Sequence, residues 1–523
     1  MHLQLLIGFG AVIWWSRDPP WEPFWSGFQP TIVVVAATTL AMLVAASGSA
    51  RRLNRTVQNA PPSLAWRRLH RSHQTLNWSC LALFLIQLTL TGWAPLWREA
   101  PIVSRIPGAP SLLTICPLIL GLITVLWALF PTDSALRHGI THNPADHEPT
   151  TTWSRGGYIL FHVRNQMLMI LLPLLVIITA YDASEPFDDL VREKLGLPWF
   201  SDLMLCLSAA CMFLLAPLLL RHVWTTQALP AGRLRNDLQT VCRRIGLACR
   251  EILVWKSNLT VVNAAVMGLF APLRYVVLSD GLLASLDHPK VEAVFGHEAG
   301  HVKHHHIPFF LLFALATMLV TSGAMELLFR LWQPVLNTDA TNESIIQGVG
   351  LVVMAACWVF GFGFLSRRFE KQADLFGARC ISPTRNQDCP LPCICHDAPP
   401  ANAATNTEPN AGTTAEATTG TNAEPNPPGL CATGARIFID ALEDVASMNG
   451  VSRDEFSWRH GSIAERVAFL TRISADPLAL ARFERSIRRI KTGLLLVCLG
   501  GTTFSIWYLW PLMTSILNKT GQE

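Results

Sequence analysis

Long apolar runs separated by polar segments dominate the pattern along this chain. Eight of these runs are long enough, or nearly so, to cross about 30 Å of hydrocarbon as helices. They lie near residues 31–48, 76–97, 111–130, 165–181, 202–220, 308–328, 347–365 and 492–515. A shorter run at 2–15 has no n-region charge and no small-residue cleavage site, which favours a retained anchor over a cleaved signal. The pattern predicts a mostly α, polytopic membrane protein with eight or nine transmembrane helices.

Composition and charge support this interpretation and assign a side to the loops. Half of the 523 residues are hydrophobic, 15% are charged and the mean hydropathy is +0.32, which is too apolar for a soluble enzyme of this size. Loops 49–75 and 131–164 are basic, whereas loop 182–200 is mainly acidic. Because short basic loops stay on the cytoplasmic side, the polar blocks 221–307 and 366–491 should face the cytoplasm. We expect a plasma or inner membrane location, contact with the lipid bilayer and no nucleic-acid partner; the oligomeric state is left open.

The first polar block predicts a small α+β domain. Residues 229–246 place their apolar side chains on one stripe, as an amphipathic helix does. The short β-branched runs EILVW, TVVNAAVM and RYVVLS follow and indicate a sheet. Asp287 or His288 can then cap a helix that has Pro289 in its first turn.

The second polar block contains an insert without apolar periodicity. Residues 381–430 are rich in Ala, Thr, Asn and Pro and bury too little apolar surface to offset the entropy of ordering. An amphipathic helix follows and should end at Asn449–Gly450. We therefore divide the chain into an N-terminal membrane region at 1–220, a core with a transmembrane hairpin (308–365) at 221–380, the insert at 381–430, the end of the domain at 431–490, and a final helix with its tail at 491–523.

The segment HEAGH at 297–301 carries the clearest chemical signal. On a helix His297 and His301 lie one turn apart on the same face, so both imidazoles can reach one metal ion. Glu298 would then sit beside the ion and accept a proton from metal-bound water. A chance match on a histidine-rich helix end is the alternative at this point. Three further histidines are interpreted as side chains at the membrane interface: His304, His305 and His306.

A catalytic zinc site needs a third protein ligand and an open position. The metzincin spacing fails, because His304 and Ile307 stand where that pattern requires Gly and His. An intramembrane site-2 protease would bury the motif inside a span, whereas here the motif lies at a membrane edge. The segment SRRFEKQAD offers Glu370 as the ligand and Asp374, one turn later, as a partner for the free ring N–H of a ligand histidine. Taken alone, this segment also fits a charged juxtamembrane helix.

Together these segments resemble the HtpX and type I CAAX prenyl endopeptidase family of membrane zinc metallopeptidases, over roughly 221–380 and 434–475. HEAGHVKHHH is similar to the family's HExGHxxxxH, and SRRFEKQAD to its S-R-x-x-E-x-x-A-D. The resemblance implies a zinc-metallopeptidase domain with one catalytic zinc per chain, and peptide or membrane-protein substrates cleaved at the cytoplasmic face. It implies that zinc is bound by His297, His301 and Glu370, and that Glu298 is the catalytic base.

The resemblance extends to two further segments. VVNAAVMG and YVVLSDGLL are similar to the family's edge-strand region, which implies that Asn263 lines an extended substrate. HGSIAERVAFL is similar to a late H-P-S-x-x-x-R-I element, which implies that His460 stabilises the tetrahedral oxyanion and that Arg466 supports the zinc site. Gly461 stands where the family has proline, so the position of His460 is less well defined. The first 220 residues match no motif of the family.

A second cluster of candidate ligands lies in and beside the insert: Cys380, Cys389, Cys393, Cys395, His396 and Cys431. In a reducing compartment such a cluster could hold a second zinc or respond to oxidants, and cysteines in an unordered loop are the alternative. The competing function is therefore a catalytically weak metal or redox sensor on the same scaffold. An intact Glu298 favours the peptidase, and the resemblance alone does not establish a prenylated substrate.

Overall fold

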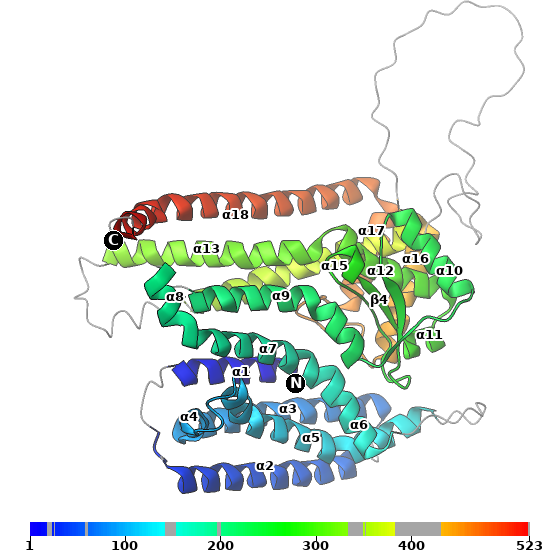
Figure 1. Cartoon of the computed structure of the whole chain (residues 1–523). Coiled ribbons are helices and arrows are strands. Elements are labelled where there is room, and N and C mark those ends of the chain that lie inside the picture. Colours follow the sequence, from blue (N-terminus) through cyan, green and yellow to red (C-terminus); the bar gives the residue numbers. More distant parts are fainter. Residues whose placement is uncertain are drawn as a thin grey trace, which may run out of the picture. The chain divides into compact units, whose positions relative to one another are not determined.

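The computed structural model describes residues 1–17, 23–25, 27–57, 61–141, 153–195, 200–332, 349–350, 352–381 and 430–520. These residues form two compact units. The first is Met1–Gln227 with Trp255–Asn258, and the second is Ala228–Val254 with Leu259–Glu523. Most of the described residues are helical, and a small four-stranded sheet accompanies the helices (Figure 1). The predicted fold class, a mostly α polytopic membrane protein with a small α+β domain, is confirmed.

The first unit consists mainly of helices, and large side chains of the longer helices pack on one another. Its helices are α1 (His2–Arg17), α2 (Phe28–Val57), α3 (Pro62–Leu90), α4 (Trp93–Glu99), α5 (Ala109–Thr141), α6 (Arg155–His162), α7 (Leu168–Ser184), α8 (Asp188–Leu195) and α9 (Phe200–Val223). Phe9, Phe84 and Leu118 belong to one shared core and are almost completely buried. Leu40 and Leu120 point outward and are at least half exposed, as expected where hydrocarbon is the solvent.

Seven of the described helices are long and apolar enough to cross a membrane. They cover Phe28–Val57, Ala109–Leu136, Arg155–Val191, Phe200–Val223, His306–Leu327, Val352–Ile381 and Pro477–Trp507, and His2–Ile13 is a shorter apolar helix. The predicted run at 76–97 is divided, because α3 ends at Leu90 and α4 begins at Trp93. The chain is therefore a multi-pass integral membrane protein.

The sheet consists of β1 (Thr226–Ala228), β2 (Glu251–Trp255), β3 (Ala264–Met267) and β4 (Tyr275–Ser279). Strands β2 and β4 coincide with the runs EILVW and RYVVLS to within one residue, whereas β3 covers only the second half of the run TVVNAAVM. The strand order is β1-β2-β4-β3, and the second unit begins at the last residue of β1. β3 pairs antiparallel with β4, with Ala264 opposite Leu278. β3 is thus the outer strand, and its other edge has no strand partner among the described residues.

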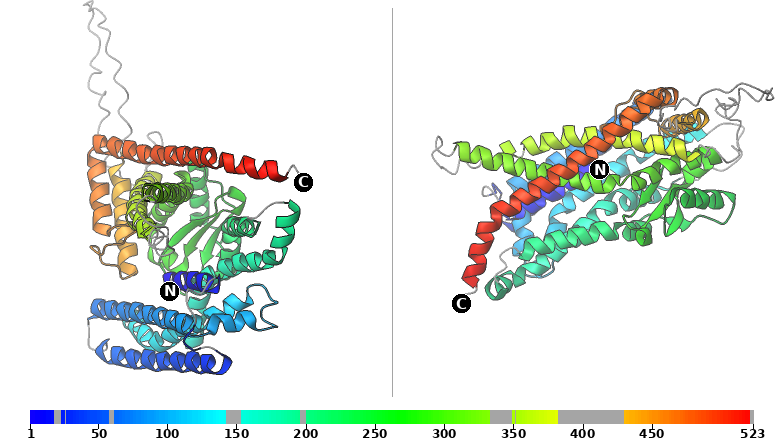
Figure 2. Two further views of the ribbon diagram at one scale, coloured as in Figure 1. Left: turned by 90° about the vertical axis from the view of Figure 1, so that its left-hand side faces the viewer. Right: turned by 90° about the horizontal axis from the view of Figure 1, so that it is seen from above.

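The second unit contains helices that contact the sheet and helices that belong to candidate membrane spans. They are α10 (Arg233–Ile245), α11 (Asp280–Ser285), α12 (His288–Lys303), α13 (His306–Trp332), α15 (Gly363–Ile381), α16 (Ala432–Met448), α17 (Ile463–Ala475) and α18 (Pro477–Thr520). As predicted, Asp287 is the N-cap of α12, and α16 stops at Asn449 with Gly450 in the left-handed region. The long helices α13 and α18 pack on each other (Figure 2).

Close contact between α12 and α15 positions the candidate site. A Cβ atom at Gly377 of α15 would lie 3.0 Å from the carbonyl oxygen of Ala293 and 3.0 Å from the backbone nitrogen of His297, both on α12. Gly300 of α12 similarly meets the backbone of Ala373. Only glycine allows two helix backbones to approach this closely. The approach brings the histidines of α12 within reach of Glu370 on α15.

Candidate metal centre

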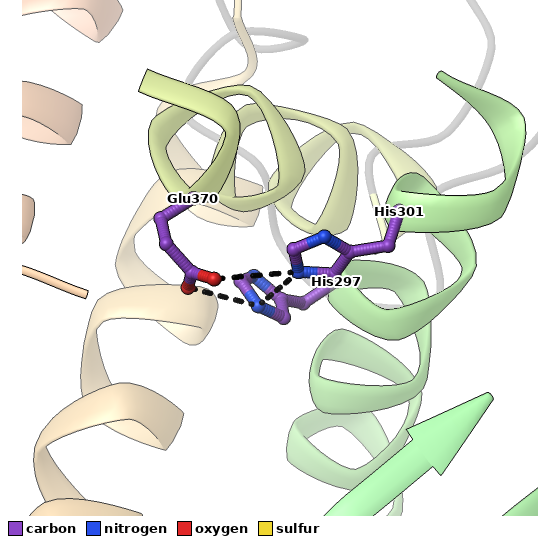
Figure 3. Close-up of side chains that lie close together, drawn as sticks. All are labelled: His297, His301 and Glu370. Atoms are coloured by element: carbon purple, nitrogen blue, oxygen red, sulfur yellow. Dashed lines mark hydrogen bonds and ion pairs between the residues drawn. The ribbon is translucent and has the colours of Figure 1, made fainter. Parts of the chain in front are cut away.

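The side chains of His297 and His301 on α12 and Glu370 on α15 point toward one another (Figure 3). The two histidine Nε2 atoms are 3.3 Å apart. Glu370 Oε2 lies 3.6 Å from His297 Nε2, and its Oε1 lies 3.7 Å from His301 Nε2. Ligand atoms of a tetrahedral zinc with bonds of about 2.0–2.2 Å are about 3.4 Å apart, so this triangle fits one ion. Among the residues that the structure describes, these three side chains are the group whose ligand atoms lie close enough together to hold a metal ion.

The other ring nitrogen of each histidine is engaged by a different partner. His297 Nδ1 lies 2.9 Å from Asp374 Oδ1, an ion-pair contact rather than a straight hydrogen bond. His301 Nδ1 is hydrogen-bonded to His306 Nδ1 at 2.8 Å. These contacts direct both Nε2 atoms toward Glu370, and a donor set of two imidazoles and one carboxylate matches the ligand preference of zinc.

A buried ion pair stands behind the three side chains. Asp374 is fully buried and accepts hydrogen bonds from Arg466 of α17, at 2.9 Å from Nε and 2.5 Å from Nη2. Arg466 Nη2 also lies 3.8 Å from Glu370 Oε2. Burial alone would lower the pKa of Arg466, but Asp374 raises it above its usual value. The permanent positive charge of Arg466 therefore faces both carboxylates. This position agrees with the supporting role that the resemblance implies for Arg466.

Glu298 occupies a half-buried position next to the sheet. Burial raises the pKa of its carboxyl to about 7, against the opposing effect of His297. The backbone N–H of Val266 on the outer strand β3 donates to this carboxylate. A carboxyl group with this pKa can take up and release a proton near neutral pH. Glu298 thus connects α12, which carries the candidate ligands His297 and His301, with the free edge of the sheet.

His460 lies beside Glu370, in the loop that precedes α17. Its Nδ1 is 3.1 Å from Glu370 Oε1, and its side chain is 47% exposed. Gly461, which replaces the proline of the related motif, has a φ of +74° and exchanges two backbone hydrogen bonds with Ser457. Proline cannot adopt this conformation, because its ring holds φ near −65°. The left-handed backbone explains why glycine stands at position 461 instead of proline. His460 nevertheless lies beside Glu370.

His306 corrects the sequence interpretation. We expected it at the membrane interface, but its side chain is fully buried. Its Nε2 is 3.0 Å from Gln372 Oε1, its Nδ1 contacts His301, and its ring stacks on Phe369 with centroids 4.3 Å apart. His305 has a φ of +57° between α12 and α13, so the chain turns before His306 enters α13. His306 is the last histidine of the HExGHxxxxH motif, and this match was the sequence signal for a position inside the site.

Replacing His306 with Leu should weaken zinc binding by about 10–100-fold, because the ring of His301 loses the group that orients it. Competition between the purified protein and a calibrated chelator measures this affinity. The exposed neighbour offers a matched control, since His305→Asn tolerates the left-handed backbone and leaves the site untouched. Equal zinc affinity of His306→Leu and the unchanged chain would show that the His301–His306 contact has no part in metal binding.

The remaining predicted residues lie in different surroundings. Asn263 is exposed just before β3, and its Oδ1 accepts the N–H of Ala264 at 2.9 Å, so its role toward a substrate stays a prediction. Cys380 is buried at the end of α15, and Cys431 is half-buried before α16. The other members of the proposed cysteine cluster lie outside the described residues: Cys389, Cys393, Cys395 and His396.

Comparison with known proteins agrees with this geometry. Residues 228–394 match peptidase family M48. The chain contains an M48 peptidase domain. This domain includes α12 and α15 and so all three converging side chains, whereas His460 and Arg466 follow it along the chain. The predicted resemblance to HtpX-like metallopeptidases is confirmed by this match and by the HtpX homologues described next.

Relatives of the M48 domain are similar over part of their length. A "Protease HtpX homolog" of Archaeoglobus fulgidus is 30% identical over 173 residues, which are 33% of this chain and 49% of the relative. One of Pyrobaculum calidifontis is 31% identical over 159 residues, 29% of this chain and 44% of the relative. The chain thus spans about half the length of the curated relatives it matches. S. mikatae Ste24p, known from a crystal structure, shares 14% sequence identity with this chain, and the alignment covers 85% of this chain and 99% of that chain. The TM-score of 0.37 is too low to support an inference about this chain.

Proposed function

We propose that the chain is a membrane-bound zinc metalloendopeptidase that hydrolyses peptide bonds at the cytoplasmic membrane face. The observation that carries this proposal is the convergence of His297, His301 and Glu370 within 4.8 Å, with Glu298 on the same helix. The M48 match over the same residues supports it. One zinc per chain fits the three donors, and a Lewis acid bound there would lower the pKa of a water molecule.

Each neighbouring side chain has a role in this mechanism. Glu298 takes the proton of the attacking water and passes it to the leaving amine. His460 contacts Glu370 through Nδ1, which leaves Nε2 to donate to the oxyanion of the tetrahedral intermediate. Asp374 holds the ring of His297, and Arg466 compensates the charge of Asp374 and Glu370.

The outer strand offers a place for the substrate. Its free edge can pair with an extended peptide, which would gain backbone hydrogen bonds along β3. Val266 of this strand already contacts Glu298, so a peptide bound there would run past the catalytic carboxylate. We therefore propose peptides or segments of membrane proteins as substrates.

Chelation tests the proposed function. Purified protein treated with 1,10-phenanthroline should lose hydrolysis of an unstructured protein such as casein, and stoichiometric Zn²⁺ should restore it, because the ligand triangle is formed by the chain itself. Mg²⁺ serves as the control ion, since it prefers six oxygen ligands and should restore nothing. Undiminished hydrolysis by protein that metal analysis shows to be zinc-free would refute a zinc peptidase.

The membrane side can be tested with two conservative serine replacements. The basic loop 49–75 predicts that loop 98–110 is external and that the domain is cytoplasmic. Ser104 and Ser452 are both exposed, so a membrane-impermeant maleimide should label Ser104→Cys in intact cells and label Ser452→Cys only after lysis. Labelling of the unsubstituted chain measures the background signal from the native cysteines. The opposite labelling pattern would place the site outside the cytoplasm.

A further inference from the structure

Two cysteines of the M48 domain meet at the end of α10, away from the residues of the metal centre. Cys242 lies in the last turn of α10, which ends at Gly246 with a φ of +66°. The N–H of Leu247 donates to the carbonyl oxygen of Cys242 at 2.9 Å, and this left-handed cap turns the chain back. Cys249, just before β2, thereby returns to α10. Both cysteines line the same pocket, and the interaction between their thiols changes the pKa of each.

Both thiols line a surface pocket that small polar reagents can enter. The pocket has a volume of about 630 Å³, and its other lining residues include Arg235, Arg243 and Arg250. Cys249 is partly exposed, whereas Cys242 is buried. Because Cys249 is the more exposed of the two cysteines, a reagent in the pocket reaches it first.

The surroundings make the two thiols chemically different. The interaction with the Cys242 thiol lowers the pKa of Cys249 to about 7, although burial and Glu251 act in the other direction. Arg274 and Arg235 add positive charge near Cys249 and favour its thiolate further. The interaction with Cys249 and burial both raise the pKa of Cys242. This is the arrangement of an attacking thiolate beside a second thiol that can resolve its oxidised form.

We propose that Cys249 and Cys242 form a peroxide-reactive modification site that closes into a reversible disulfide. The Cys249 thiolate attacks an oxygen of hydrogen peroxide, so that an S–O bond forms, the O–O bond breaks and hydroxide leaves to become water. The sulfur of Cys242 then attacks the sulfenic sulfur of Cys249, the S–S bond forms and a second water leaves. The two cysteines lose two electrons and two protons in total, and one peroxide becomes two water molecules.

The segment between the two cysteines is attached to the metal-ligand helix. Lys303, two residues after His301, donates from Nζ to the carbonyl oxygen of Ile245 at 2.9 Å. Leu238 of α10 and Phe295 of α12 belong to the same buried cluster. A disulfide between Cys242 and Cys249 would therefore constrain a turn that is in contact with α12. The proposal does not depend on the peptidase function, and its test uses no activity measurement.

Peptide mapping of the full-length protein tests this site. The purified chain is treated with equimolar hydrogen peroxide at pH 7.5, blocked with iodoacetamide and digested. We expect a peptide pair linked through Cys242 and Cys249, which dithiothreitol separates. In Cys242→Ser, dimedone should trap a sulfenic acid on Cys249, and in Cys249→Ser no disulfide should form at Cys242. Cys380 is buried and therefore poorly accessible to peroxide, so it is the internal control and should react at least about ten-fold more slowly.

Two results would overturn the proposal, and both can be seen in the wild-type chain without any variant. One is a Cys249 that stays reduced while Cys380 or other cysteines are oxidised. The other is a disulfide between Cys242 and Cys380, which also lies near Cys242. Either would mean that the pocket does not select Cys249 as the reacting thiol.

Discussion

Glu298→Gln should reduce peptide hydrolysis by about a thousand-fold or more while one zinc per chain remains bound. The amide has nearly the shape of the carboxylate, and its oxygen can still accept the N–H of Val266, so the fold and the ligand triangle are kept. The amide cannot take the proton of the attacking water. The loss is therefore expected in the chemical step, with no loss of metal.

Zinc analysis and a casein or peptide assay on the same preparation test this expectation. Glu292→Gln, on the same helix but outside the ligand triangle, is a matched control and should retain both zinc and activity. Activity of Glu298→Gln within ten-fold of the unchanged chain would show that another group acts as the base.

Glu370→Ala should lower zinc affinity by at least about a hundred-fold, because two imidazoles alone leave an incomplete site. The change also leaves Arg466 facing one carboxylate instead of two and removes the partner of His460 Nδ1. Zinc content after dialysis against a weak chelator measures the effect. This variant should also lose hydrolysis, whereas Glu298→Gln keeps its metal, so the pair separates the ligand from the base.

A carboxylate outside the site provides the control for Glu370→Ala. Glu484 forms an ion pair with Arg379 at 2.9 Å near the surface, where such pairs contribute about 0–1 kcal/mol. Glu484→Ala should retain full zinc occupancy. Full occupancy in Glu370→Ala would mean that the third ligand lies elsewhere in the chain.

Local spacing explains why the candidate ligands could be predicted from the sequence. His297 and His301 are one helical turn apart, and Glu370 and Asp374 repeat that spacing, so each pair shares a face whatever the rest of the fold does. The three strands were likewise predictable from short β-branched runs. The meeting of α12 with α15 depends on glycines at their contact, and no local pattern in the sequence specifies which helices those glycines join.

Contacts that depend on turns between helices or strands could not be predicted from local sequence patterns. The burial of His306 follows from the left-handed residue His305, and histidine in such a conformation has no clear sequence signal. The contact of Cys242 with Cys249 depends in the same way on the cap at Gly246. Hydropathy also concealed the break between α3 and α4, because Thr91 and Gly92 interrupt the helix but lower the average hydropathy of the run at 76–97 only slightly.

X-ray absorption at the zinc edge of the purified full-length protein tests the central claim most directly. A site formed by His297, His301 and Glu370 predicts one zinc per chain with only nitrogen and oxygen neighbours, at about 2.0–2.2 Å, and the multiple-scattering pattern of two imidazoles. The same measurement on Glu370→Ala should show almost no zinc. A shell of sulfur at about 2.3 Å in the unchanged chain would place the metal on cysteines and contradict the account.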